Sequence, residues 1–480
     1  MPRLRRTKIV ATLGPASDSA QTIAAMIDAG VDMFRLNFSH GTAEQHLRRA
    51  QLIRSIAADK QRELAIMGDL QGPKIRIRSF AAGGVDLTIG ADFRLDTELA
   101  EDAGNLAEVG VDLATLPQSV TSGDQLLLDD GRIRLQVKSI DGTRVNCVVI
   151  QGGRLSNRKG LNKLGGGLSA PSLTEQDLEH IALAPTLGLD YVAVSFPLSA
   201  DDIHQARTLL VAAGSHAAIV AKVERAEVVN DERVMDALIE AADAIMVARG
   251  DLGVEIGDAQ LMAVQKQLIN KARNMQRTVI TATQMMESMV SSPIPTRAEV
   301  FDVANAVLDG SDAVMLSAES ASGQYPVETV RAMAETCVGA ETYPEVYRSD
   351  AAALARNFQR IDETVAMAAV YAANHLENVA GMVCLTESGT TALRMSRIKS
   401  PYPIFALSRN PEVVRRMSLY RGVIPITFDY TVFPAEEVAS KVVAAVRERG
   451  LVNSGDRLVM TRADLMGVGG STTTLKILEI

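Results

Sequence analysis

Two apolar segments near the middle of the chain end in charged residues whose types suit phosphate and metal chemistry. The first runs from Ala218 to Glu224 and carries Lys222, and the second runs from Ala244 to Asp251. Because a strand buried on both faces excludes charge from its middle, charge at its end marks where chemistry would take place. Carboxylates are hard oxygen ligands for a divalent ion, and a lysine is a compact cation for a phosphate. The alternative interpretation is a salt bridge between strand ends that has no function.

Short apolar runs of this kind recur through the first two-thirds of the chain. Eight of them occupy two stretches: Lys8–Leu13, Met33–Phe38, Leu64–Asp69, Tyr191–Phe196, Ala218–Glu224, Ala244–Arg249, Thr278–Thr283 and Ala313–Glu319. Segments with helical periodicity separate most of them, such as Thr22–Ala29, His46–Ala57, Leu261–Met275 and Glu299–Leu308. Alternating strands and helices predict a parallel sheet, and eight repeats predict a (β/α)8 TIM barrel.

Local motifs mark two helix starts and one helix end. Ser172–Glu175 and Thr296–Glu299 have the spacing of a capping box. Gly310 follows Asp309, and a glycine at this place predicts the end of the second of these helices.

The carboxyl ends of all strands in a TIM barrel meet at one face, where active sites lie. Seven of the eight predicted strands have polar residues at or just after their ends: Arg35, Asn37, Ser39 and His40; Asp69, Lys74 and Arg76; Ser195; Lys222 and Glu224; Arg249, Gly250 and Asp251; Thr281, Thr283 and Gln284; Ser317 and Glu319. Burying so many polar groups would cost folding free energy if they had only a structural role. The set offers metal carboxylates, cations for phosphates and hydroxyls that relay protons, which predicts metal-assisted phosphoryl transfer.

The third and fourth strands are too far apart to be joined by one helix, and the residues between them, about 72–169, change character. Alternating or apolar runs occur at Val85–Ile89, Gln125–Leu128, Ile133–Val137 and Val145–Val149, with tight turns at Asp129–Gly131 and Asp141–Gly142. We expect a small all-β domain inserted above the active face of the barrel. The glycines at 165–167 are either the hinge of a lid or a plain linker.

Beyond about residue 343 the alternation starts again and predicts an open α/β domain. We expect a helix at Thr364–Leu376 and strands at Gly381–Leu385, Ile404–Leu407, Val423–Phe428, Leu458–Thr461 and Leu475–Leu478. Between the first strand and the next helix, hydroxyls and a glycine form either a phosphate-binding loop or an ordinary helix cap; these residues are Thr386, Ser388, Gly389, Thr390 and Thr391. The predicted domains are 1–71 with 170–343, then 72–169, then 344–480.

The composition excludes several classes of function. A net charge of −9 provides no basic surface for nucleic acid, and no apolar run is long enough to span a membrane. The three widely spaced cysteines, Cys147, Cys337 and Cys384, form neither a disulfide framework nor a zinc motif, and they suit the cytoplasm. A Walker A motif and a kinase glycine-rich loop are both missing from the sequence.

Six motifs give the chain a specific resemblance to pyruvate kinase. They are TKIVATLGPAS at 7–17, RLNFSHG at 35–41, KVE at 222–224, VARGDLG at 247–253, ATQMMESM at 282–289 and MLSAE at 315–319. The resemblance runs through the whole chain and is closest to the bacterial isoenzyme activated by AMP or sugar monophosphates. It implies a catalytic barrel, a mobile lid and a regulatory domain in a homotetramer. The implied glycolytic reaction transfers a phosphoryl group from phosphoenolpyruvate to ADP, with Mg²⁺ or Mn²⁺, to give pyruvate and ATP.

The resemblance also implies roles for the residues that would contact phosphoenolpyruvate and the metal. Glu224 and Asp251 would hold the divalent ion. Lys222 would contact the transferring phosphoryl group and steady the enolate, and Arg35 would hold the phosphate. Backbone N–H groups at Gly250 and Asp251 would bind the carboxylate together with Thr283. A proton would reach the enolate carbon through water from Thr283 and Ser317.

Other implied roles concern the nucleotide, the effector and a monovalent cation. The nucleotide side would contain Asn37, His40, Arg76 and Lys159, and the loop of Thr386, Ser388, Gly389, Thr390 and Thr391 would bind the phosphate of a sugar activator. Many family members bind potassium beside the phosphoryl group, where their motif reads DTKGPE. Here residues 69–74 read DLQGPK, so a hydroxyl is lost and a lysine replaces a glutamate.

The lysine at this place predicts independence from potassium. Near Asn37, Ser39 and Asp69, the ammonium of Lys74 would supply the same single charge without a dissociable ion. The alternative is that Lys74 points to solvent. A second departure is the lid motif GVNLPG of the family, which is GLNKLG at 160–165 and lacks the proline.

Two other functions fit part of the pattern. A barrel lyase or aldolase acting on pyruvate through a divalent ion also needs paired carboxylates, but it needs neither the inserted domain nor Arg76 and Lys159. A non-catalytic sugar-phosphate sensor on the same scaffold would tolerate the loss of Lys222 or of a metal carboxylate, and all three residues are present.

Overall fold

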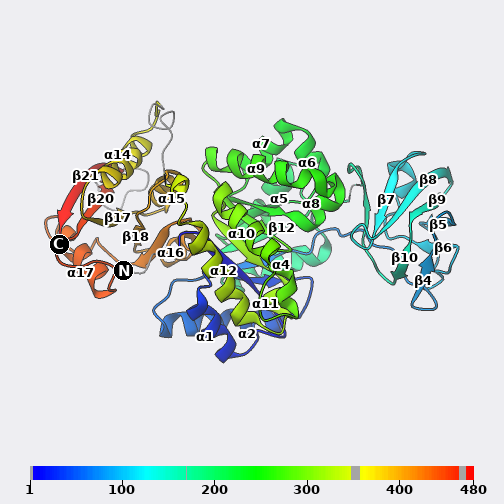
Figure 1. Cartoon of the computed structure of the whole chain (residues 1–480), viewed down its shortest axis with the longest axis horizontal. Helices are drawn as coiled ribbons and strands as arrows, with labels where there is room; N and C mark the ends of the chain where they lie inside the picture. Colours follow the sequence, from blue (N-terminus) through cyan, green and yellow to red (C-terminus); the bar gives the residue numbers. More distant parts are fainter. Residues whose placement is uncertain (1–3, 169, 348–356, 464–471) are drawn as a thin grey trace.

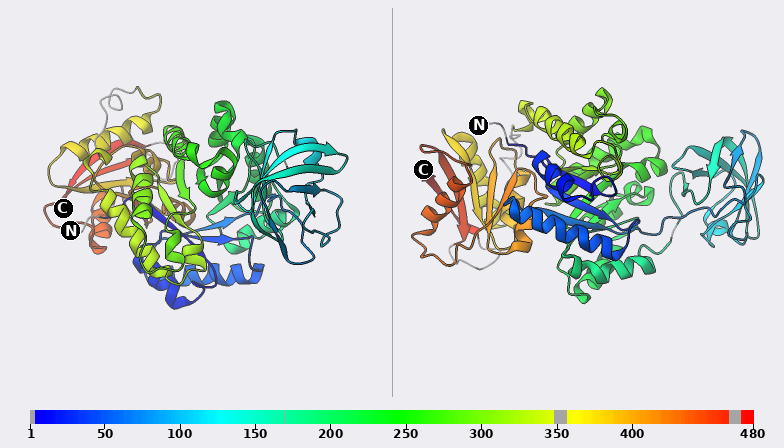
Figure 2. Two further views of the ribbon diagram at one scale, coloured as in Figure 1. Left: turned by 45° about the vertical axis from the view of Figure 1, so that its right-hand side comes forward. Right: turned by 90° about the horizontal axis from the view of Figure 1, so that it is seen from below.

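The computed structural model describes residues 4–168, 170–347, 357–463 and 472–480. Figure 1 shows a central barrel with a β domain at one end and a C-terminal α/β domain at the other, and the views in Figure 2 show the same arrangement. The predicted fold class is therefore confirmed, including the inserted β domain and the C-terminal open sheet. Among the described helices, none combines the length and the apolar character needed to cross a bilayer.

The barrel contains the eight expected parallel strands. They are β1 (Lys8–Leu13), β2 (Met33–Asn37), β3 (Ala65–Asp69), β12 (Tyr191–Val194), β13 (Ala218–Val223), β14 (Ala244–Ala248), β15 (Thr278–Ala282) and β16 (Ala313–Leu316). The closed order is β1-β16-β15-β14-β13-β12-β3-β2. Most predicted strand ends differ from the observed ones by one or two residues, and the largest difference is at the last strand. This strand stops at Leu316, because residues 318–321 turn into a short helix and Glu319 accepts hydrogen bonds from the amides of Met286 and Ser317.

Helices cover the outside of the barrel. They are α1 (Ala20–Ala29), α2 (Ala43–Asp59), α4 (Glu175–Leu187), α5 (Ala200–Ala212), α6 (Ala226–Asn230), α7 (Glu232–Ala241), α8 (Arg249–Ile256), α9 (Asp258–Asn274), α10 (Arg297–Asp309), α11 (Ala318–Ala321) and α12 (Pro326–Ala340), with 3₁₀ turns η1 (Glu287–Val290) and η2 (Pro344–Val346). Apolar faces of the helices and strands pack into one large core between the two layers. Strands covered on both faces must be apolar almost throughout, so their polar residues gather at the ends.

The two predicted capping boxes had different outcomes. Thr296 caps α10 and exchanges hydrogen bonds with Glu299, as expected, and Gly310 ends that helix in a left-handed conformation. The box at Ser172 was wrong by two residues, because Thr174 caps α4 and pairs with Asp177. The hydroxyl of Ser172 donates instead to Asp202 at 2.7 Å.

The inserted domain consists of mostly antiparallel strands around its own apolar core, with β5 and β6 paired in parallel. Its elements are β4 (Gly84–Leu87), β5 (Asp92–Asp96), β6 (Glu108–Gly110), α3 (Leu116–Ser119), β7 (Gln125–Leu128), β8 (Ile133–Asp141), β9 (Arg144–Gln151), β10 (Gly153–Ser156) and β11 (Leu161–Lys163). The main sheet has the order β11-β7-β8-β9-β5-β6, and β10 pairs with β4. We call this unit the β domain.

The C-terminal domain is an open sheet with helices packed on it. Its elements are α14 (Ile361–His375), β17 (Val379–Leu385), α15 (Thr390–Arg397), β18 (Ile404–Ser408), α16 (Pro411–Met417), β19 (Val423–Thr427), α17 (Val438–Glu448), β20 (Arg457–Ala463) and β21 (Thr472–Glu479). The strand order is β19-β18-β17-β20-β21, and only the pairing of β20 with β21 is antiparallel within this sheet.

The C-terminal domain closes the amino-terminal end of the barrel. Leu419 packs among the residues of the barrel interior. The hydroxyl of Tyr191 donates to the carbonyl of Arg416 at 2.8 Å, and the Lys8 ammonium donates to the carbonyl of Val423 at 2.6 Å. Because this end is covered, the opposite end remains for binding and chemistry, and the β domain lies on that side (Figure 1).

Candidate active site

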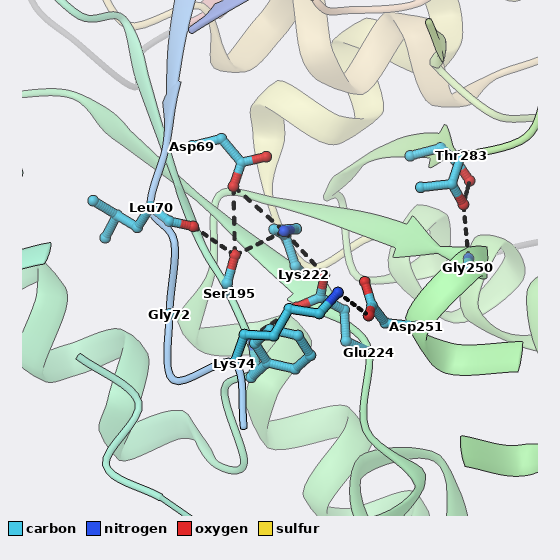
Figure 3. A network of polar contacts seen from close by, with 12 residues as sticks. Asp69, Leu70, Gly72, Lys74, Ser195, Lys222, Glu224, Gly250, Asp251 and Thr283 are labelled. Carbon is cyan, nitrogen blue, oxygen red and sulfur yellow. Dashed lines mark hydrogen bonds and ion pairs between the residues drawn. The ribbon is translucent and has the colours of Figure 1, made fainter. Parts of the chain in front are cut away.

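Lys222, at the end of β13, is the centre of a polar network at the open end of the barrel (Figure 3). Its ammonium lies 2.7 Å from the hydroxyl of Ser195, 2.9 Å from Glu224 Oε1 and 3.4 Å from Asp69 Oδ1. The Ser195 hydroxyl in turn donates to the carbonyl of Leu70 at 2.7 Å. Residues at the ends of three strands, β3, β12 and β13, therefore form this network.

The neighbouring carboxylates keep Lys222 protonated although it is buried. Burial lowers the pKa of Lys222, but the carboxylates of Asp69 and Glu224 outweigh it, so the pKa lies above its ordinary value. Burial likewise raises the pKa of Asp69, and the charges of Arg35 and Lys222 outweigh that effect and lower it. The site thus holds a permanent ammonium and a permanent carboxylate away from bulk water.

Arg35 lies next to this pair on β2. Its Nε donates to Asp69 Oδ2 at 2.6 Å, and its Nη1 contacts the hydroxyl of Thr12 at 3.1 Å. Asp69 therefore bridges two cations that are fixed by different strands. Arg35 and Lys222 present positive charge to the same end of the barrel, where an anion with several oxygens could contact both.

Glu224 and Asp251 lie beside one another in Figure 3. Glu224 is buried, and its Oε2 accepts a hydrogen bond from the Phe196 amide at 2.8 Å. Burial raises the pKa of Glu224, the charge of Asp251 raises it further, and Lys222 offsets part of the rise. The two neighbouring carboxylates repel each other, and a bound divalent cation would relieve this repulsion.

The donor set fits a magnesium-type ion better than a fully enclosed metal. In the described part of the chain no group of three or more His, Cys, Asp or Glu side chains gathers as a metal cage. Glu224 and Asp251 supply two carboxylates, and Mg²⁺ in proteins is commonly held by one or two carboxylates with water and substrate phosphates. These two residues are therefore the candidate metal ligands.

Gly250 and Thr283 form a second group beside the metal carboxylates. The Gly250 amide, in the first turn of α8, donates to the Thr283 hydroxyl at 2.7 Å. Thr283 and Gln284 both have positive φ values, 69° and 54°, which are unfavourable for residues with a side chain. Ser317 follows β16 at the same end of the barrel, and its amide donates to Glu319 at 2.7 Å.

The residues predicted for the nucleotide side fall into two pairs. Asn37 ends β2, its Oδ1 accepts from the Ser39 amide at 3.2 Å, and His40 is exposed in the same turn. Arg76 and Lys159 lie together in the β domain, where Arg76 pairs with Gly160 and the Lys159 ammonium contacts Asp129 at 2.7 Å. One pair is thus on the barrel and the other on the inserted domain.

Lys74, predicted to lie near Asn37, Ser39 and Asp69, contacts one of the candidate metal ligands. Its ammonium lies 3.4 Å from Asp251 Oδ1 and its side chain is 29% exposed. The contact of Lys74 is therefore with a metal carboxylate, whereas Asp69 is engaged by Arg35 and Lys222. Leu70, which follows Asp69, is buried and has no polar atom in its side chain.

The predicted effector loop forms a compact turn at the start of α15. Thr386 Oγ1 accepts from the Gly389 amide at 2.9 Å, and the hydroxyls of Ser388 and Thr390 lie 2.9 Å apart. Thr391 is buried and contacts the hydroxyl of Thr472 at 2.8 Å. Gly389 has a φ of 81°, so the turn needs a glycine at this position.

Sequence reasoning missed several contacts of the site. Ser195 ends a predicted strand, but it has no role among the predicted site residues although it lies closest to the Lys222 ammonium. Thr12 and the Phe196 amide were also missed. The signal for Ser195 was present, because it is a polar residue that directly follows the fully buried β12.

Comparison with known proteins gives one consistent result. The family model described as pyruvate kinase, barrel domain, matches residues 4–330, and the one described as pyruvate kinase, alpha/beta domain, matches residues 363–478. The chain is 53% identical to "Pyruvate kinase II" of Salmonella typhimurium, with 100% of this chain and 99% of the relative covered, and 53% identical to "Pyruvate kinase" of Haemophilus influenzae, with 98% of each covered.

A solved structure resembles the whole fold. The crystal structure of a pyruvate kinase from Cryptosporidium parvum matches with a TM-score of 0.91 and 34% sequence identity, covering 99% of this chain and 96% of that one.

Proposed function

The chain belongs to the pyruvate kinase family, and we propose that the polar network around Lys222 is the site at which it transfers a phosphoryl group from phosphoenolpyruvate to ADP. The observation that carries this proposal is the contact of one buried ammonium with Ser195, Glu224 and Asp69 beside a second carboxylate, Asp251. The products of the reaction are pyruvate and ATP. Members of this family use a divalent ion such as Mg²⁺.

In the proposed mechanism, fixed cations stabilise the charge that develops during transfer. Lys222 faces the phosphoryl group and the enolate oxygen that leaves it, and Arg35 holds the phosphate. Because Asp69 and Ser195 hold Lys222 in place, little reorganisation is needed as charge shifts between these oxygens. Glu224 and Asp251 would hold the divalent ion, which would supply positive charge to balance the negative charge that develops during transfer.

The other strand ends position the substrate and deliver a proton. The amides of Gly250 and Asp251, at the start of α8, bind the carboxylate together with the hydroxyl of Thr283. Because Thr283 already contacts the Gly250 amide, the substrate carboxylate would displace this hydrogen bond. After transfer, Thr283 and Ser317 pass a proton through water to the enolate carbon.

The β domain acts as a lid that brings nucleotide contacts to the barrel. Arg76 and Lys159 move with the β domain, whereas Asn37 and His40 stay on the barrel. The proposal assigns residues 1–71 and 170–343 to the catalytic barrel, 72–169 to the lid and 344–480 to the regulatory domain. A cytoplasmic location belongs to the same proposal, and it agrees with three cysteines that are free and buried.

A coupled assay tests the reaction and its metal requirement together. With phosphoenolpyruvate, ADP and Mg²⁺, the purified chain should form pyruvate and ATP in equal amounts, and excess chelator should stop both. Pyruvate formation with release of inorganic phosphate and without ATP would mean hydrolysis of phosphoenolpyruvate, and it would contradict transfer to ADP.

We also propose that Lys74 replaces the monovalent cation. Its ammonium lies 3.4 Å from Asp251, and the side chain of the buried Leu70 offers no oxygen ligand to potassium. The activity should therefore agree within about twofold with potassium, sodium or tetramethylammonium at constant ionic strength. Activation of tenfold or more by potassium, about 1.4 kcal/mol, would refute the proposal.

The variant Lys74→Glu provides the second arm of this test. We expect it to lower the activity and to introduce a partial response to potassium, because the new carboxylate can bind the ion but Leu70 still lacks a hydroxyl. The conservative variant Lys74→Arg keeps the charge and should remain independent of potassium. A Lys74→Glu enzyme with normal activity in every salt would contradict a role for this charge.

The loop at the start of α15 is the proposed activator site. We expect a phosphorylated sugar, with glucose 6-phosphate favoured over a bisphosphate, to bind there and to shift the enzyme toward its active state. Ser388→Glu should abolish activation by like-charge repulsion and should leave turnover at saturating phosphoenolpyruvate intact. Unchanged activation in this variant would place the site elsewhere, and Ser440→Glu on α17 is the exposed control.

A homotetramer is part of the regulatory proposal. Phe301, Ile294 and Leu308, on or next to α10, are 74%, 71% and 45% exposed, and such a group of large apolar side chains suits a contact with a second copy. Sedimentation with and without glucose 6-phosphate measures whether the activator stabilises the assembly.

A further inference from the structure

The connection that leads from the β domain back to the barrel is held by three charged residues that the proposed mechanism does not use. Asn162 Nδ2, on β11, donates to Glu255 Oε1 at 3.4 Å, and the Gly165 amide donates to the Glu255 carbonyl at 2.8 Å. The Gly167 amide donates to Glu227 Oε1 at 2.5 Å. Arg225 donates to the carbonyl of Leu168. We call Arg225, Glu227 and Glu255 the anchor residues.

On the barrel side, the anchor residues are joined to each other. The Ala226 amide donates to Glu255 Oε2 at 2.8 Å, and Arg225 lies 3.6 Å from Glu255 Oε1 and 3.1 Å from Glu227 Oε1. Glu255 therefore contacts both the β domain and the segment that follows β13.

The anchor residues adjoin both candidate metal ligands along the chain. Arg225 directly follows Glu224, and Glu255 lies one helical turn after Asp251 on the same helix, α8. The outgoing connection reaches α8 as well, through the contact of Lys74 with Asp251 at 3.4 Å. Both connections of the β domain thus meet the helix that carries a metal carboxylate.

The returning connection contains three consecutive glycines where it meets the anchor residues. Gly165, Gly166 and Gly167 have φ values of 86°, 83° and 98°, which side chains disfavour. A Cβ added at Gly166 would lie 2.6 Å from Glu227. Gly166 therefore serves close packing against Glu227, whereas a Cβ added at Gly165 would meet nothing within 4 Å.

The charges of the anchor residues are buried or partly buried and have few hydrogen-bond partners. Glu255 is only 2% exposed, and burial raises its pKa to about 7 although Arg225 and the Ala226 amide lower it. Arg225 Nε and Glu227 Oε2 are buried without a hydrogen-bond partner among the described residues. Weakening one contact of the anchor would therefore affect the others, because each charge depends on the same few partners.

We propose that Glu255 is a positioning residue of the reaction, which transmits the position of the β domain through α8 to the carboxylate of Asp251. The proposal rests on the function proposed above, in which Asp251 binds the metal. It predicts that the docked β domain and the metal support each other's binding, because one rigid helix carries the contacts of both.

The variants Glu255→Gln and Asn162→Ala test the contact from its two sides. Glu255→Gln keeps the shape and removes the charge, and Asn162→Ala removes the partner on the β domain without altering α8. Each should accelerate amide exchange of residues 160–168 and weaken Mn²⁺ binding, measured by electron paramagnetic resonance without substrate, by about tenfold. The KM for phosphoenolpyruvate should rise, while kcat at saturating metal and substrate should stay within about threefold.

A double-mutant cycle separates coupling from general damage. If one contact carries the effect, the double variant should bind Mn²⁺ no more weakly than the worse single variant. Glu240→Gln, at an exposed position of α7, is the matched control and should change neither measurement. Circular dichroism and thermal unfolding confirm that the variants are folded.

Two results would overturn the inference. One is unchanged Mn²⁺ affinity in both folded variants despite faster exchange of residues 160–168, and the other is unchanged exchange. In either case the wild-type transfer reaction and its loss in Glu224→Gln would still support the proposed function. If Glu224→Gln bound Mn²⁺ normally, the metal site would be assigned to the wrong residues. This result would contradict the proposed function itself, independently of Glu255.

Discussion

Replacing Lys222 by methionine should lower kcat by three or more orders of magnitude, about 4 kcal/mol or more of transition-state stabilisation. Methionine keeps much of the length and apolar volume of the side chain but has no charge. Because Lys222 contacts Asp69, Ser195 and Glu224, its ammonium is fixed before the substrate arrives, and water cannot replace it efficiently. The KM for phosphoenolpyruvate should change far less than kcat, since Arg35 and the metal remain.

The control for this variant is Lys271→Met, which removes a partly exposed lysine that pairs with Asp236 on the outside of the barrel. Its kcat should stay within about twofold of the wild type. Steady-state kinetics at saturating phosphoenolpyruvate, ADP and Mg²⁺ measures both variants. A Lys222→Met enzyme with near-normal turnover would remove this residue from the mechanism.

Replacing Glu224 by glutamine should have the second-largest effect, a loss of about 100-fold or more in kcat/KM, or about 2.7 kcal/mol. The amide keeps an acceptor for the Phe196 N–H but loses the charge that would bind the metal and balance Lys222. Excess Mn²⁺ should restore part of the activity, because Asp251 remains as a ligand. The exposed variant Glu179→Gln on α4 should have no effect.

The dependence of metal binding on pH provides an independent check on Glu224. The pKa of Glu224 is raised by burial and by Asp251, so protons compete with the metal at a higher pH than for an ordinary glutamate. Mn²⁺ affinity should therefore fall as the pH falls through this raised pKa. In Glu224→Gln this decline should be shallower. An identical pH dependence in both proteins would mean that another group controls metal binding.

The barrel could be predicted from the sequence because its strands are buried on both faces. Each strand is a short apolar run, so polar residues mark where it ends, and seven of the predicted strands have such residues. Among these seven, the end of the last strand was misplaced at Glu319, since a short helix directly after a strand gives no separate periodicity. The capping box at Ser172 failed for a related reason, because Thr174 two residues later offers the same chemistry with Asp177.

The contacts within the site were harder to predict than its members. Sequence spacing indicated that Lys222, Glu224, Asp251 and Asp69 converge, but it did not show which carboxylate each cation would approach. Lys74 lies at Asp251 because the chain turns after β3, with Gly72 at a φ of 67°, and this turn directs the side chain across the barrel end. The role of Ser195 depends on a distance of 2.7 Å across neighbouring strands, which no sequence pattern contains.

The most direct measurement of the central claim is a crystal structure of the enzyme with Mn²⁺ and phosphoenolpyruvate, in which anomalous scattering locates the metal. We predict one manganese ion with a carboxylate oxygen of Glu224 and one of Asp251 at about 2.1–2.2 Å. A phosphate oxygen of the substrate should lie within hydrogen-bond distance of the Lys222 ammonium, at about 2.7–3.0 Å. Manganese bound away from these two carboxylates, or a phosphate out of reach of Lys222, would contradict the account.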